Sequence, residues 1–117
     1  MRLVLLLSLI IAIVVVAGPA GAASPPVLRG TVGPGFTITL KSATGKSVRT
    51  LKPGAYTFAI RDLSGIHDFH LRGPGVNKTT SVVGTGKAAW TLRLRPGRYS
   101  YVCDPHHAFM QGSFVVR

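Results

Sequence analysis

Residues 90–97, Trp-Thr-Leu-Arg-Leu-Arg-Pro-Gly, carry the clearest structural signal in the chain. Apolar and polar side chains alternate over the first six positions, which places them on opposite faces of an extended strand. The Pro-Gly pair then ends the strand, because these two residues favour tight turns. The same alternation runs through Phe36–Lys41 and Tyr56–Arg61. It predicts β-strands that have one face buried and the other in solvent.

Further segments of this kind fill the rest of residues 28–117 and are separated by Gly- and Pro-rich turns. Strands at such spacing predict an all-β domain of about seven to nine strands, built as an antiparallel sandwich or barrel. No helical period longer than one turn is visible in this region. The remaining expected strands are Leu28–Val32, Ser47–Leu51, His67–Leu71, Thr79–Val83, Gly97–Cys103 and Ser113–Arg117.

The N-terminal segment has the layout of a secretory signal. Arg2 precedes the apolar run Leu3–Ala17, and Ala20-Gly21-Ala22 fits a cleavage site. The run is shorter than the roughly 20 apolar residues of a membrane-spanning helix. We therefore expect a signal peptide over 1–22 cleaved near Ala22, a linker over 23–27 and one β-domain over 28–117. If the segment is not cleaved it would anchor the domain, and both cases make the domain secreted or otherwise extracytoplasmic, in the periplasm or cell envelope.

The residues that offer nitrogen or sulfur ligands gather in two short windows, Ile66–Leu71 and Cys103–Met110. Beyond the signal segment, no other His, Cys or Met occurs in the sequence. This distribution predicts a single site that is formed by two loops. The six residues are His67, His70, Cys103, His106, His107 and Met110.

The second window can present three different ligands to one point. Cys103 ends an apolar strand, His106 can turn back towards it because Pro105 restricts the chain between them, and Met110 stands where the next strand begins. A further strong ligand has to come from the first window, and His67 is the natural candidate. Two His and one Cys in a plane with a weak axial Met form a blue-copper site. Such ligands suit both Cu(I) and Cu(II), which allows fast one-electron transfer.

The segment Tyr101-Val102-Cys103-Asp104-Pro105-His106, followed by Met110-Gln111-Gly112-Ser113-Phe114-Val115, resembles the copper loop of the cupredoxins, above all the plastocyanin, pseudoazurin and amicyanin group. Ile66-His67-Asp68-Phe69 resembles the upstream ligand segment of that family. The resemblance implies a Greek-key β-sandwich with one type 1 copper at one end, and electron transfer between larger redox partners. Carried over to this chain, the copper ligands are His67, Cys103, His106 and Met110.

Two features depart from the pattern of the family. Three residues separate His106 from Met110, fewer than in plastocyanin and more than in amicyanin, and this spacing should tune the distance of the axial ligand. Gln111 is the alternative axial ligand. Asp68 stands where the family has an Asn that ties the two loops together by hydrogen bonds near the thiolate. An ionised Asp cannot donate a hydrogen bond, and its charge should stabilise Cu(II) and lower the reduction potential.

Several of these residues also have simpler interpretations. Cys103 could be a small buried hydrophobe, although an unpaired thiol in an exported protein is exposed to oxidation unless it is buried or metal-bound. Met110 could simply pack in the core. On a strand, His67 and His70 point to opposite faces, so we expect His67 inside and His70 at the surface or hydrogen-bonded behind a ligand. His107 is expected at the exposed rim of the site or in solvent.

The charge bears on the partner. The chain carries 14 Lys and Arg against 3 Asp and no Glu, a net charge of +11. These cations are spread along strands and turns and form no clustered run, which disfavours nucleic acid as the partner. They fit attraction to an acidic redox protein or association with an anionic envelope surface.

We expect a monomeric electron carrier and not an enzyme. Multicopper oxidases and copper nitrite reductases contain such domains, but they need additional His-rich copper sites that four histidines cannot supply unless a trimer shares ligands between subunits. A copper-delivery protein without an electron-shuttle role would use the same ligands, so the ligand pattern leaves this function open. A purely structural β-domain that binds no metal is also compatible with the strand pattern.

Overall fold

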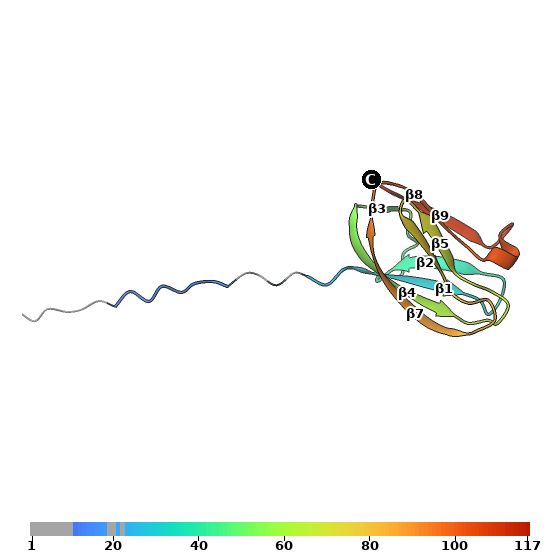
Figure 1. Ribbon diagram of the computed structural model, residues 1–117, viewed down its shortest axis with the longest axis horizontal. Coiled ribbons are helices and arrows are strands. Elements are labelled where there is room, and N and C mark those ends of the chain that lie inside the picture. The colour runs from blue at the N-terminus through green and yellow to red at the C-terminus, as the bar shows by residue number, and fades with distance from the viewer. Residues whose placement is uncertain (1–10, 19–20, 22) are drawn as a thin grey trace, which may run out of the picture.

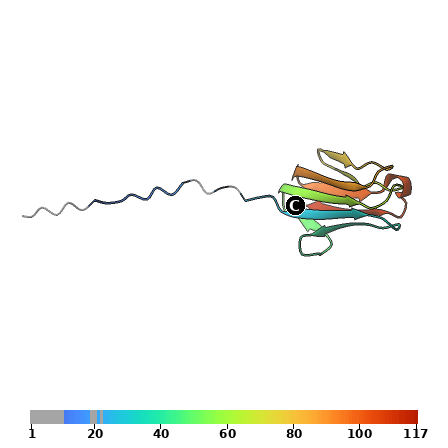
Figure 2. The ribbon, with the colours of Figure 1, turned by 90° about the horizontal axis from the view of Figure 1, so that it is seen from below.

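The alternating segments form two β-sheets that pack face to face (Figures 1 and 2). The computed structural model describes residues 11–18, 21 and 23–117. Within them it has nine strands and one short 3-10 helix, η1. These elements are β1 Val27–Val32, β2 Ile38–Ser42, β3 Thr50–Leu51, β4 Gly54–Asp62, β5 His70–Gly73, β6 Val76–Thr79, β7 Gly86–Leu94, β8 Gly97–Val102, η1 Asp104–His106 and β9 Gln111–Val116.

The predicted all-β Greek-key sandwich of about seven to nine strands is confirmed, but its sheets are not purely antiparallel. One sheet has the order β2-β1-β4-β7 and the other the order β3-β9-β8-β5-β6. β1 pairs with β4, and β3 with β9, in parallel. Parallel partners are joined by long connections that leave the sheet edge. Alternation within each strand carries no information about such a connection, so the antiparallel expectation was wrong at these two pairs.

Two expected strands near the site differ from the observed ones. The expected strand Thr79–Val83 was wrong, because β6 covers Val76–Thr79 and forms a hairpin with β5. The side chain of Thr80 accepts a hydrogen bond from the backbone N–H of Phe69 at 2.8 Å, which ends the hairpin pairing at this point. β5 begins only at His70, so the segment before it is a loop and not the start of a strand.

The core lies between the sheets and includes two stacked aromatic pairs. Phe69 stacks on Tyr101 with ring centroids 5.5 Å apart, and Tyr99 stacks on Phe114 at 5.2 Å. Gly112 leaves room for the Tyr101 ring of the first pair, because a Cβ at position 112 would lie 2.3 Å from that ring. The loops that hold the candidate site therefore start from strands fixed in a rigid core.

The chain before β1 leaves the sandwich at the end opposite η1 (Figure 1). Most of the predicted signal peptide 1–22, including its cleavage position Ala22, lies outside the described residues. Residues 11–18 have no regular secondary structure. Across residues 11–18, 21 and 23–117, no helix has the length and apolar character needed to cross a membrane.

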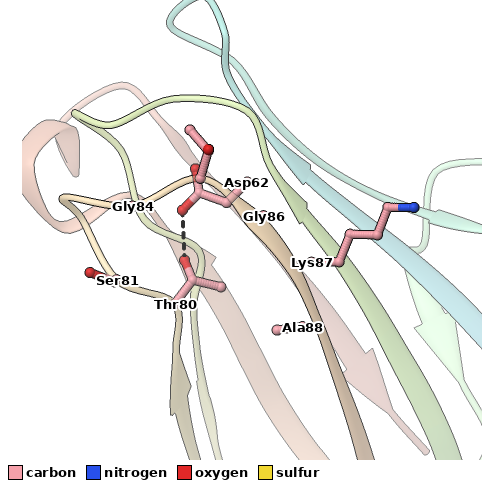
Figure 3. A pocket seen from close by; sticks show the side chains of 8 residues that line it. Asp62, Thr80, Ser81, Gly84, Gly86, Lys87 and Ala88 are labelled. Atoms are coloured by element: carbon pink, nitrogen blue, oxygen red, sulfur yellow. Dashed lines mark hydrogen bonds between the residues drawn. The ribbon is translucent and has the colours of Figure 1, made fainter.

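A buried carboxylate holds the loop between β6 and β7 against the end of β4. Asp62 accepts hydrogen bonds from the backbone N–H of Ser64 at 3.2 Å and from the hydroxyl of Thr80 at 3.1 Å. The small hollow beside it, of about 180 Å³, is drawn in Figure 3. Both carboxylate oxygens have partners, so Asp62 fixes the loop that follows β4 and the loop that follows β6. The loop that follows β4 carries His67.

Candidate metal centre

Three of the predicted ligand residues converge at one end of the sandwich. His67 comes from the loop between β4 and β5, Cys103 directly follows β8, and His106 ends η1. The Sγ atom of Cys103 lies 3.6 Å from the Nδ1 atoms of both His67 and His106, and these two nitrogens are 3.1 Å apart. A point equidistant from three atoms so placed lies about 2 Å from each, close to the roughly 2.0–2.3 Å bonds of imidazole and thiolate to zinc.

The donor set fits a bound metal ion. The two imidazole nitrogens and the sulfur face one another, and they are a cluster that could hold a metal ion. The other ring nitrogen of His67, Nε2, is buried and has no hydrogen-bond partner among the described residues. The ring is instead placed by packing, with the Phe36 ring at a centroid distance of 5.3 Å. Thus Nδ1 is the atom that His67 directs to the shared point.

The loop that carries Cys103 and His106 is short and closed by backbone hydrogen bonds. The N–H of Cys103 donates to the carbonyl of Met110 at 3.0 Å, and the N–H of Met110 donates to the carbonyl of His106 at 2.9 Å. These bonds hold Met110 alongside Cys103. Both side chains are fully buried, at 1% and 0% exposure. Met110 is therefore held next to Cys103, and its role as a ligand stays a prediction.

Burial governs the protonation of the thiol. It raises the pKa of Cys103, and the backbone amides of Asp68 and His106 offset only part of that rise. The nearby carboxyl of Asp68 raises the pKa of the thiol further. The metal-free protein therefore holds a protonated thiol at neutral pH, and metal binding must release this proton.

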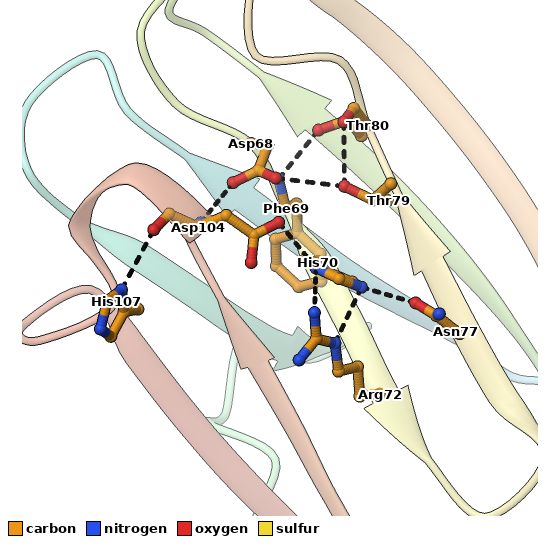
Figure 4. A network of polar contacts seen from close by, with 9 residues as sticks. All are labelled: Asp68, Phe69, His70, Arg72, Asn77, Thr79, Thr80, Asp104 and His107. Carbon is orange, nitrogen blue, oxygen red and sulfur yellow. Dashed lines mark hydrogen bonds and ion pairs between the residues drawn. The ribbon is translucent and has the colours of Figure 1, made fainter.

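Asp68 joins the two ligand loops by accepting hydrogen bonds (Figure 4). Its Oδ1 accepts from the backbone N–H of Asp104 at 2.6 Å, and its Oδ2 accepts from the hydroxyl of Thr79 at 3.2 Å. Burial, followed by the nearby Asp104 side chain, raises the pKa of Asp68. A carboxylate can thus tie these loops together without donating a hydrogen bond.

His70 is buried and hydrogen-bonded behind the ligand loop, which is one of the two positions expected for it, and the alternative position at the surface was wrong. Its Nδ1 donates to Oδ2 of Asp104 at 2.7 Å, and its Nε2 lies 2.6 Å from Oδ1 of Asn77 (Figure 4). The guanidinium of Arg72 packs beside the ring, with Nε 3.0 Å from Nε2. Both ring nitrogens face these partners, which leaves His67 as the histidine of this window that faces Cys103.

Asp104 is the junction of this network. Burial opposes its ionisation, but the hydrogen bond from His70 and the charge of Arg72 hold the pKa of Asp104 below its usual range. Its carbonyl lies 3.2 Å from Nδ1 of His107, whose ring is exposed. His107 therefore contacts the backbone of the loop, at the exposed rim where the sequence placed it.

An apolar rim surrounds the half-buried ring of His106. Phe36 lies 5.0 Å from the His106 ring and 5.9 Å from that of Phe109, measured between centroids. Phe36 and Phe109 are 58% and 63% exposed. The sequence pattern does not reveal this rim, because Phe36 fits the apolar face of the next strand. Its position directly after Gly33-Pro34-Gly35 is the signal that could have separated it from that strand.

Comparisons with known proteins agree with this architecture. The model of the family described as "copper binding proteins, plastocyanin/azurin family" matches residues 35–117. Among solved structures, rusticyanin from Thiobacillus ferrooxidans is 22% identical with a TM-score of 0.56, over 82% of this chain and 79% of that one. Auracyanin A from Chloroflexus aurantiacus, described as a "blue" copper protein, is 18% identical with a TM-score of 0.54, over 80% of this chain and 100% of that one. Both likenesses show the fold. No curated protein sequence matches the chain significantly.

Proposed function

The chain belongs to the plastocyanin/azurin family of copper-binding proteins, and from this premise we propose that it is an exported one-electron carrier with one type 1 copper. The observation that supports the proposal most is the approach of Cys103 Sγ and two imidazole Nδ1 atoms to within 3.1–3.6 Å of one another. In this proposal His67, Cys103 and His106 would hold the copper, and Met110 would be a further, weaker ligand. Bound copper would supply a Cu(I)/Cu(II) couple at this point.

The protein's own contribution is to hold the ligands still. The two loops are joined by Asp68, the ligand loop is closed by backbone bonds to Met110, and η1 is fixed to β5 through His70. Hydrogen-bonded partners behind metal ligands orient them and tune the metal. A set of ligands that binds both Cu(I) and Cu(II) without moving favours rapid electron exchange over tight retention of one oxidation state.

Electrons would enter and leave through His106. Its ring is the half-buried member of the trio, whereas His67 and Cys103 are fully buried. The surrounding Phe36 and Phe109 offer a small apolar contact to a redox partner protein. A small interface is typical of weak electron-transfer complexes. The net charge of +11 would speed encounter with an acidic partner, in a salt-dependent way.

The same geometry favours electron transfer over copper delivery. A delivery protein must pass the metal to ligands of its target, but here the sulfur of Cys103 and the side chain of Met110 are buried. A carrier has only to pass an electron through the His106 edge. The electron self-exchange rate separates these functions, because fast exchange supports the shuttle and slow exchange with strong Cu(I) retention supports delivery.

The experiment that tests the proposal is a titration of the metal-free protein with Cu(II), followed by visible absorption. One equivalent of copper should produce an intense thiolate-to-copper band. The Cys103→Ser variant should lose this band, and His106→Ala should alter it strongly. His107→Ala is the matched control, because this exposed histidine lies in the same loop, and its band should remain. Copper uptake without an intense band in the unaltered protein would refute the proposal.

A further inference from the structure

The outer face of the β2-β1-β4-β7 sheet is a continuous basic surface. Along each strand the inward side chains are buried and the alternate side chains point outward. The register places the outward residues of the four strands side by side. The outward cations are Arg29, Lys41, Arg61, Lys87 and Arg93. We call these five residues, with the Ala and Thr side chains between them, the basic face.

The cations on this face lie opposite one another. Arg29 is the register partner of Lys41, and Arg61 is the register partner of Lys87. Like charges directly opposite each other on a sheet are destabilising. Figure 3 shows Lys87 pointing away from the carboxylate of Asp62. This arrangement leaves a local repulsion that bound anions would relieve.

None of the chain's acidic side chains forms an ion pair with this face among the described residues. The sequence has only three, and two of them, Asp62 and Asp68, are buried at 4% and 2% exposure. The third, Asp104, pairs with His70 on the copper loop. That pair is the one ion pair in the described part of the chain, so the counter-charge for the basic face has to come from another molecule.

Two adjoining hollows give this face the chemistry of an anion-binding surface. One, of about 430 Å³, has a floor of Ala59 and Ala89 and is bordered by Arg29, Arg61 and Lys87. The other, of about 510 Å³, is bordered by Arg29 and Lys41 together with Thr31 and Thr39. Arg, Lys and hydroxyl groups are the usual partners of phosphate oxygens.

We propose that the basic face binds the surface of an anionic phospholipid bilayer. Stable protein interfaces combine Arg with aromatic anchors such as Trp and Tyr, whereas the side chains between the cations of this face are almost all Ala and Thr and include no aromatic residue. Cations spread over four strands match a surface of many separate phosphates better than one acidic patch on a protein.

Binding through this face leaves the copper end free. Gly33, which follows β1, packs against the ring of His67, so the metal centre lies at the end of the sandwich and not on the basic face. The apolar rim of Phe36 and Phe109 would then point along the bilayer. A partner in or on the same membrane could reach His106 by diffusion in two dimensions. The proposed lipid binding does not itself depend on electron transfer.

The test uses co-sedimentation of the copper-loaded full chain with vesicles. Phosphatidylcholine vesicles that contain phosphatidylglycerol should bind the protein, added salt should weaken binding, and free inorganic phosphate should compete only through ionic strength. The triple variant Arg29→Gln, Arg61→Gln, Lys87→Gln should bind on the order of a hundredfold more weakly. The matched control Lys52→Gln, Arg98→Gln, Arg117→Gln removes the same charge outside the basic face and should bind nearly as well as the parent chain.

Three outcomes would overturn the proposal. Equal losses in both triple variants would mean that only net charge matters. Equal binding to pure phosphatidylcholine would assign adsorption to the apolar N-terminal segment. Binding to polyglutamate without binding to the anionic vesicles would assign the face to an acidic protein. An unchanged copper absorption band and an equal or higher Tm would show that the face variant is folded, since the substitutions remove like-charge repulsion.

Discussion

Replacing Asp68 by Asn should raise the reduction potential of the bound copper. The substitution keeps the shape of the side chain and its carbonyl can still accept the N–H of Asp104, which now lies 2.6 Å from Oδ1. What changes is the charge. A buried carboxylate next to the Cys103 end of the ligand loop stabilises the more positive metal state, Cu(II), and its removal favours Cu(I).

The size of the effect follows from the distances. Asp68 accepts a hydrogen bond from the amide directly after Cys103, so its charge lies close to the ligand loop. Two unit charges about 5 Å apart interact by about 3 kcal/mol at an effective dielectric constant of about 20. Arg72 and His70, which surround Asp104, offset part of this field. With about 2.3 kcal/mol per 100 mV for one electron, we expect the potential to rise by about 50–100 mV.

The assay is a spectroscopic redox titration of both proteins at neutral pH. Asp62→Asn is the matched control, because it makes the same change at another buried carboxylate, whose hydrogen bonds go to Ser64 and Thr80. Its potential should move much less. An equal or lower potential in Asp68→Asn would refute the electrostatic argument. An equal rise in both variants would show that the effect is not local to the ligand loop.

Three further predictions concern residues around the site. His70→Leu should weaken copper binding about tenfold to a hundredfold, because partners behind metal ligands usually contribute that much. Copper affinities measured by competition with a chelator check this, with His107→Ala as the control. Equal affinities of the two variants would show that His70 does not position the ligands. Asp68→Asn should raise the free energy of unfolding of the metal-free protein at neutral pH, because burial raises the pKa of Asp68 and its ionisation therefore costs stability. Urea titrations should show this gain in stability shrinking as the pH falls towards about 4. A gain in stability that grows in acid would contradict the prediction. Phe36→Ala should slow electron exchange with a partner protein and leave the visible band in place; stopped-flow kinetics tests this, and an unchanged rate would place the contact elsewhere.

The sequence predicted the strands and the location of the site well, because both depend on local patterns. Alternation marked the strand that contains Trp90, and the restriction of His, Cys and Met to two windows indicated a two-loop site. The structure brings Cys103, His67 and His106 together as that distribution predicted. The assignment of Met110 as the axial ligand stays a prediction.

The features that the sequence did not reveal depend on contacts between distant segments. The parallel pairing of β1 with β4 is fixed by how the chain crosses between strands, which no local pattern encodes. The hydrogen-bonded position of His70 depends on Asp104, which is 34 positions away. Phe36 continues the alternation of β2 and so looked like a core residue, although it packs on the rings of His67 and His106 at the surface.

X-ray absorption at the copper edge of the loaded protein tests the central claim most directly. It reports which atoms bind the metal and at what distance. The account predicts one short copper–sulfur bond and two copper–nitrogen bonds, and loss of the sulfur contribution in Cys103→Ser. A first coordination sphere of only nitrogen and oxygen in the unaltered protein would contradict the claim that Cys103 and two imidazoles share one copper ion.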